Sequence, residues 1–181
     1  MKYQFKIYLT DKDYLDFNLF MGMRSPYGKK QLKTGRIAYL ILTLCLMAVF
    51  LLLDGKREVS ILAVTTLVVM MIVCQLFFKR IFASSTKAQL KLLKKSGKLA
   101  YSPEAIIEFY DDVFVETTAT NRTEQKYSSI ERISVVDNKF AYIHISSVNA
   151  YILPFYAFSS QEQCDSFFAF IRTKCPIIDV Y

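Results

Sequence analysis

One histidine and one pair of adjacent aspartates are the side chains of this sequence best suited to proton transfer. His144 lies in an alternating stretch, Phe140–Ser146, with no second histidine and no carboxylate motif beside it. A general base needs a partner that orients it, so we expect His144 to lie on a sheet surface, hydrogen-bonded or solvated. Asp111 and Asp112 fall where two strands must turn, and we expect them to form that turn. The sequence therefore predicts no catalytic residue.

Cysteines and glycines give no sign of a metal or cofactor site. The four cysteines lack the C-x-x-C spacing of a metal site, and the five glycines are too scattered for a phosphate-binding loop. The two long apolar stretches contain no ionisable side chain, which argues against an ion pathway through a single chain. We therefore expect a protein that is not an enzyme and that binds no cofactor and no metal.

Lysines at helical spacing are the remaining candidate site. Lys87, Lys91, Lys94 and Lys98 follow one another at intervals of four, three and four residues, which places them on one face of a helix expected over residues 84–98. Such a face can bind anionic lipid headgroups while leucines enter the acyl boundary. In the other interpretation, which stays open here, the lysines are only solvated and the leucines pack on the domain that follows.

The net charge of +7 is distributed very unevenly along the chain. Residues 24–36 carry five basic side chains and residues 79–98 carry seven, with no acidic residue in either segment. Residues 99–181 hold 6 basic and 11 acidic residues. The basic charge thus flanks the apolar stretches, and we expect no nucleic-acid partner.

Two adjacent apolar stretches predict a transmembrane hairpin in residues 37–78. Residues 37–53 and 59–78 contain no charged residue, and as helices they would be about 26 and 30 Å long. The rest of this 181-residue chain is too short to cover both helices as a soluble core. Twelve basic residues flank the hairpin and two lie in its loop, so the positive-inside rule predicts a two-span protein of the cell membrane with both termini cytoplasmic.

The segments on either side of the hairpin are expected to be cytoplasmic. In residues 1–36, alternation over Tyr3–Leu9 predicts a strand, and a capping box of Thr10 and Asp13 begins a helix that ends before Ser25–Gly28. Residues 79–98 are expected to form a basic juxtamembrane helix. The chain would then have four parts: residues 1–36, the hairpin 37–78, the basic helix 79–98 and a domain 99–181.

An α+β domain is predicted for residues 99–181. A capping box of Ser160 and Gln163 begins a final helix there, whose apolar stripe includes Phe167 and Phe168. The expected fold is an antiparallel sheet of the pleckstrin-homology-like (PH-like) kind, capped by this C-terminal helix. Alternating stretches predict its strands at Ala105–Tyr110, Val113–Thr118, Glu124–Tyr127, Ile130–Asp137, Phe140–Ser146 and Ala150–Pro154, with tight turns at Asp111-Asp112 and Asp137-Asn138.

The whole pattern resembles the YcxB-like family of small bacterial membrane proteins. The likeness is carried by the helix start Thr10–Phe17, the two apolar stretches, and the segments Tyr127–Ile133, Phe140–Ile145 and Ile152–Phe158. Members often have a basic residue directly after the proline of the last segment, where this chain has Phe155. The resemblance implies a PH-like cytoplasmic domain without enzymatic activity.

These observations predict a membrane-anchored interaction or regulatory module at the inner leaflet, with no catalysis of its own. Its expected partners are the lipid bilayer, with anionic headgroups as candidates, and a protein or a second copy of the chain. The alternative is an accessory subunit of a transport or membrane-modifying complex whose chemistry resides in other chains.

Overall fold

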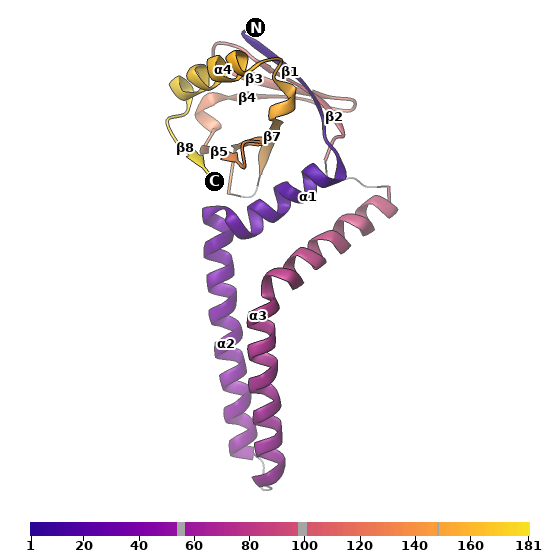
Figure 1. Ribbon diagram of the computed structural model, residues 1–181, viewed down its shortest axis with the longest axis vertical. Helices are drawn as coiled ribbons and strands as arrows, with labels where there is room; N and C mark the ends of the chain where they lie inside the picture. The colour runs from indigo at the N-terminus through magenta and orange to yellow at the C-terminus, as the bar shows by residue number, and fades with distance from the viewer. Residues whose placement is uncertain (54–56, 98–100, 148) are drawn as a thin grey trace. The chain divides into compact units, whose positions relative to one another are not determined.

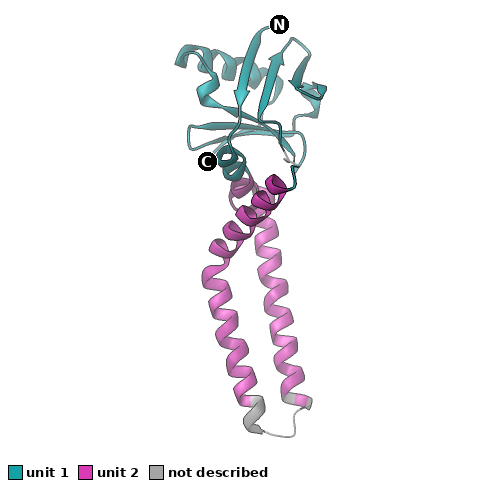
Figure 2. Ribbon diagram, turned by 90° about the vertical axis from the view of Figure 1, so that its right-hand side faces the viewer, with its two compact units in different colours: residues 1–17, 96–181 teal, residues 18–95 magenta. Residues whose placement is uncertain are grey.

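The computed structural model describes residues 1–53, 57–97, 101–147 and 149–181 (Figure 1). It divides into two compact units (Figure 2). The α+β unit contains residues 1–17 and 96–181, and the helical unit contains residues 18–95. In the sequence, the helical unit is therefore inserted into the α+β unit.

The first sheet combines a strand from the N-terminal segment, residues 1–17, with three strands from residues 96–181. Its strand order is β1-β2-β3-β4, and all neighbours are antiparallel. The strands are β1 (Tyr3–Tyr8), β2 (Glu104–Phe109), β3 (Val113–Thr118) and β4 (Arg122–Lys126). Six residue pairs join β1 to β2. The expected boundary at residue 99 is therefore wrong for the domain, because β1 belongs to the same sheet; local periodicity does not reveal a partner so distant in sequence.

The second sheet contains a strand that the sequence did not predict. Its order is β7-β6-β5-β8, and β8 pairs with β5 in parallel while the other neighbours are antiparallel. The strands are β5 (Arg132–Val136), β6 (Phe140–His144), β7 (Ala150–Pro154) and β8 (Ile178–Val180). At three residues, β8 is too short to show a period of two.

Both predicted tight turns are confirmed. Asp137 and Asn138 each have a φ of 51°, in the left-handed region that aspartate and asparagine tolerate in tight turns, and the Lys139 N–H donates to the Val136 carbonyl at 2.9 Å. At the turn of Asp111 and Asp112, the Tyr110 N–H donates to the Val113 carbonyl at 2.9 Å. These turns fix the strand registers on either side.

The final helix closes the core, as predicted. The helix α4 (Gln161–Lys174) begins at Ser160, whose Oγ accepts a hydrogen bond from the Gln163 N–H at 3.2 Å. Phe167 is 1% exposed, and its ring centroid lies 5.2 Å from that of Phe5 and 4.9 Å from that of Phe109. Side chains from both sheets and α4 thus form one hydrophobic core.

The helical unit is built from two long antiparallel helices that lie side by side (Figures 1 and 2). They are α2 (Pro26–Leu53) and α3 (Arg57–Lys95). The shorter α1 (Asp11–Leu19) and the π-helical turn η1 (Phe20–Arg24) lead into α2. The Thr10–Asp13 capping box is confirmed, since each residue's backbone N–H donates to the other's side chain.

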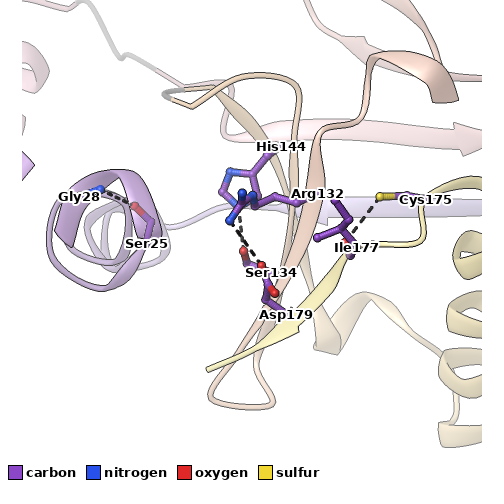
Figure 3. A network of polar contacts seen from close by, with 8 residues as sticks. All are labelled: Ser25, Gly28, Arg132, Ser134, His144, Cys175, Ile177 and Asp179. Carbon is purple, nitrogen blue, oxygen red and sulfur yellow. Dashed lines mark hydrogen bonds and ion pairs between the residues drawn. The ribbon is translucent and has the colours of Figure 1, made fainter. Parts of the chain in front are cut away.

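The turn expected at residues 25–28 instead begins a helix. Ser25 precedes Pro26, and the Gly28 N–H donates to Ser25 Oγ at 2.9 Å, as at a helix N-cap (Figure 3). Proline is well tolerated in the first helical turn because its missing N–H would have no helical partner there. The Ser25 hydroxyl also donates to the Met21 carbonyl at 2.6 Å, which ties η1 to α2.

Gly28 is expected to tolerate no side chain at this junction. A Cβ placed there would clash with the Met21 carbonyl oxygen and would lie 2.6 Å from the Gly22 carbonyl carbon. Because both are backbone atoms, a rotamer change cannot relieve the clash. We expect Gly28→Ala to destabilise the full chain by about 1–3 kcal/mol, the usual range for overpacking.

Gly35→Ala is the matched control, because a Cβ at Gly35 meets nothing within 4 Å. Thermal unfolding of the detergent-purified chain, followed by circular dichroism, measures both variants. Gly35→Ala should melt at or slightly above the wild-type temperature, since alanine favours a helix over glycine. Equal melting of the two variants would contradict the close approach of η1 and α2.

Candidate functional site

Few residues of the apolar stretches of α2 and α3 are buried. Of the most apolar 18-residue window in each helix, 11% is buried in α2 and 0% in α3. Leu52, Leu62 and Leu76 are 84%, 70% and 74% exposed. A helix that belonged to a water-soluble core would cover such side chains. Both helices are long and apolar enough to cross a membrane.

The threonines of these stretches are satisfied within their own helices. Thr65 Oγ1 donates to the Ile61 carbonyl at 2.8 Å, and Thr43 Oγ1 donates to the Tyr39 carbonyl at 2.8 Å. Such bonds let a hydroxyl lie in an apolar environment without a partner helix. These threonines are therefore compatible with an apolar surrounding.

Basic side chains gather at the end of the helical unit opposite the α2–α3 connection. The Arg36 guanidinium lies 5.2 Å from the centre of the Phe78 ring, so the start of one apolar stretch is level with the end of the other. Cations beyond these points on both helices are thus at the same end. We call this set the cationic collar: Lys29, Lys30, Lys33 and Arg36 on α2, and Lys79, Arg80, Lys87, Lys91, Lys94 and Lys95 on α3.

The collar includes the predicted lysine face. Lys87, Lys91 and Lys94 are exposed residues of α3, which is helical without interruption from the apolar stretch to Lys95. Lys98 lies outside the described residues. At about 100° per residue, these three lysines and Arg80 fall within a sector of about 60° on the helix surface. Arg80 was not among the predicted residues of this face, although its spacing of seven residues to Lys87 places it there.

His144 is buried, so its expected place on a sheet surface is wrong. It is 4% exposed, and its Nε2 lies 3.0 Å from Oγ of the fully buried Ser134 (Figure 3). Alternation assigned the faces of β6 correctly, but the second face is covered as well: Phe17 of α1 packs edge-on against Tyr142, with ring centroids 5.1 Å apart. Burial, with a smaller contribution from the Arg132 charge, lowers the pKa of His144 to about 4.

This depressed pKa predicts a loss of stability in mild acid. The imidazole of an unfolded chain has a pKa of about 6.5, so between about pH 6.5 and pH 4 the unfolded chain binds a proton that the folded chain does not. The stabilisation from neutral His144 is complete above that window and falls as the pH falls through it. From pH 7 to pH 5, wild type should therefore lose more free energy of unfolding than His144→Gln, as measured by urea titrations at both pH values. Identical losses would show that His144 is not buried in its neutral form.

Asp111, one of the two turn aspartates, forms an ion pair within the α+β unit, as do Arg132 and Asp179. The Lys2 ammonium lies 2.6 Å from the Asp111 carboxylate and lowers its pKa. Arg132 and Asp179 form an ion pair of 3.5 Å that joins β5 to β8 (Figure 3). Among the described residues, no group of three or more His, Cys, Asp or Glu side chains is arranged to hold a metal ion.

One hollow of about 280 Å³ lies in the α+β unit at the ends of β1, β2 and β3. Most of its lining residues are aliphatic or carry a hydroxyl group, and its charged residues are Lys6 and Glu104. It contains no histidine or cysteine that would serve as a base or a nucleophile.

Fold and site together define a discontinuous α+β unit into which a two-helix apolar hairpin with a cationic end is inserted. No protein-family model, curated protein or solved structure matches the chain. Any functional conclusion therefore depends on the geometry of the molecule itself.

Proposed function

We propose that the protein is a membrane-anchored interaction or regulatory module without catalysis of its own. The helices α2 and α3 would form a transmembrane hairpin, and the α+β unit would be a PH-like domain at the cytoplasmic face. The observation that carries this proposal is the exposure of the apolar stretches, of which 11% and 0% are buried. Such a surface supports a lipid surrounding.

The sheet supplies an argument for topology that is independent of charge. Strands β1 and β2 precede and follow the helical unit, and they pair along six residues, from Tyr3↔Phe109 to Tyr8↔Glu104. Paired strands must lie on one side of any bilayer that the helices cross. The cationic collar lies at the end where the chain enters α2 and leaves α3, and the positive-inside rule assigns that side to the cytoplasm.

Charge also separates the roles of the two units. The helical unit has 13 basic and 2 acidic residues, whereas the α+β unit has 10 basic and 14 acidic residues. An excess of acid disfavours binding of the α+β unit to an anionic leaflet. Its two sheets and closing helix support the PH-like assignment, and we expect its surface to recognise a protein, either a partner or a second copy.

The alternative is an accessory subunit of a transport or membrane-modifying complex. It is favoured by one observation, the large side chains exposed on both apolar stretches, since Phe50 and Phe77 are 42% and 44% exposed and could pack on helices of other chains. The two proposals differ in which unit contacts the partner.

A hairpin exchange distinguishes them. Replacing residues 37–78 with an unrelated two-span hairpin of the same length and topology keeps the α+β unit and the cationic collar. If the α+β unit is the interaction module, the proteins that copurify in mild detergent should be unchanged. If they are lost while the variant stays in the membrane and folds, the hairpin contacts the partner and the accessory-subunit reading holds. Survival of the same copurifying proteins after unfolding of the α+β unit would contradict the module.

A further inference from the structure

We propose that the end of α3 beyond its apolar stretch, residues 80–95, is an interfacial helix that binds the anionic phospholipid headgroups of the leaflet. This inference rests on the proposed function, because it requires α2 and α3 to cross a bilayer. It adds a lipid-binding site that the span itself does not need.

Helix length leaves a segment outside the hydrocarbon. At about 1.5 Å per residue, the 39 residues of α3 are about 58 Å long, whereas the hydrocarbon core is about 30 Å thick. As a straight rod, α3 would carry Leu92 about 21 Å beyond Phe78, past the headgroups and into water. A helix that turns into the interface avoids this.

The structure shows a bend in α3 beyond its apolar stretch. Both views show that α3 changes direction between its apolar stretch and its C-terminal end (Figures 1 and 2). Between the apolar stretch and Lys95, Thr86 Oγ1 donates to the Phe82 carbonyl at 2.9 Å, and hydroxyl bonds of this kind often bend helices. A Cβ on Gly22 would clash with the Phe82 ring, so η1 packs closely on α3 at Phe82. The bend is thus built into the helical unit.

The bent segment has the two faces of an interfacial helix. Its cationic sector of about 60° contains Arg80, Lys87, Lys91 and Lys94, and Ile81, Ala88 and Leu92 lie within about 40° of one another on a neighbouring face. Ile81 and Leu92 are 50% and 66% exposed. Cations can therefore reach headgroups while the apolar side chains enter the acyl boundary.

Two features of residues 80–95 favour lipid as the ligand: their basic charge and their direct connection to the apolar stretch of α3. The segment carries no acidic residue, which suits an anionic surface. It continues directly from the apolar stretch of α3, so the leaflet is already adjacent when the hairpin is inserted. The exposed Leu92 offers acyl chains an apolar contact that a nucleic acid or an acidic peptide would not use.

Tryptophan quenching tests this in the full chain, which contains no tryptophan. Leu92→Trp places a reporter on the bent segment, and Leu46→Trp places one within the apolar stretch of α2. Each variant is reconstituted in phosphatidylcholine vesicles with a fixed fraction of brominated lipid, either phosphatidylcholine or phosphatidylglycerol. Bromine quenches only tryptophans that contact the lipid.

Both reporters should be quenched, and Leu92→Trp should be quenched more by brominated phosphatidylglycerol than by brominated phosphatidylcholine. The difference should vanish in about 1 M salt, where the Debye length falls to about 3 Å. Quenching at Leu46→Trp without quenching at Leu92→Trp would overturn the interfacial helix and leave the hairpin intact. Absence of quenching at Leu46→Trp would overturn the membrane hairpin itself.

A matched pair of triple variants isolates the cationic sector. Lys87→Gln, Lys91→Gln and Lys94→Gln, combined in the Leu92→Trp background, should abolish the preference for brominated phosphatidylglycerol. Lys6→Gln, Lys12→Gln and Lys126→Gln remove the same charge from exposed positions of the α+β unit and should leave the preference unchanged. Equal loss in both triple variants would assign the preference to net charge and overturn the site.

Discussion

Phe167→Ala is expected to destabilise the α+β unit by about 3–5 kcal/mol, a large part of the roughly 5–15 kcal/mol that holds a small domain folded. Phe167 is 1% exposed. It packs α4 against the first sheet through ring contacts with Phe5 on β1 and Phe109 on β2. Truncation would leave a cavity among rings that cannot easily collapse. Urea unfolding of the full chain in mild detergent, followed by the near-ultraviolet signal of its tyrosines, measures the loss.

Phe168→Ala is the matched control. The sequence alone suggested that Phe168 would be as critical, but the structure places it half-buried at the margin of the core, against Phe155 and Phe158. Its truncation should cost clearly less than that of Phe167. Equal destabilisation would mean that α4 is rotated about its axis relative to the structure.

Residues 99–181 produced alone are expected not to fold. The missing strand β1 contributes Phe5 and Ile7, which are 0% and 2% exposed, and it covers the β2 edge of the first sheet. Without it, the apolar side chains of β2 and an unpaired strand edge would meet water. Residues 1–17 joined to residues 101–181 by a glycine- and serine-rich linker should instead fold as a soluble domain.

Circular dichroism and urea titration measure whether residues 99–181 alone and the linked chain of residues 1–17 and 101–181 unfold cooperatively. Ile7→Asp in the linked chain is the control, because it keeps the length and linker but buries a charge, and it should abolish cooperative unfolding. A cooperative transition of residues 99–181 alone, equal to that of the linked chain, would contradict the role of β1.

Local signals in the sequence predicted the parts of the fold that local physics determines. The capping pairs Thr10–Asp13 and Ser160–Gln163, the positive-φ turn at Asp137 and the two apolar helices all depend on residues within a few positions of one another. Pairings across the chain were missed. Membership of β1 in the sheet and the parallel pairing of β8 depend on partners that no short window contains.

The candidate sites likewise could be predicted where they depend on neighbouring residues, and not where they depend on residues distant in sequence. The spacing of Lys87, Lys91 and Lys94 required only a continuous helix, which the structure has. Arg80 was missed because the cationic face was sought only within the helix expected over residues 84–98. Burial of His144 was missed because alternation identifies two faces of a strand but not whether a distant segment, here α1 through Phe17, covers the second one.

Cysteine labelling in intact cells tests the central claim, a membrane hairpin inserted between paired strands of one cytoplasmic domain. Single cysteines are placed at Lys6 in β1, at Lys126 in β4 and at Gly55 between α2 and α3, in a chain whose four native cysteines are replaced by alanine. A membrane-impermeant maleimide should label Gly55→Cys in intact cells, and Lys6→Cys and Lys126→Cys only after lysis. Labelling of Lys6→Cys and Lys126→Cys from opposite sides, or protection of Gly55→Cys until lysis, would contradict the account.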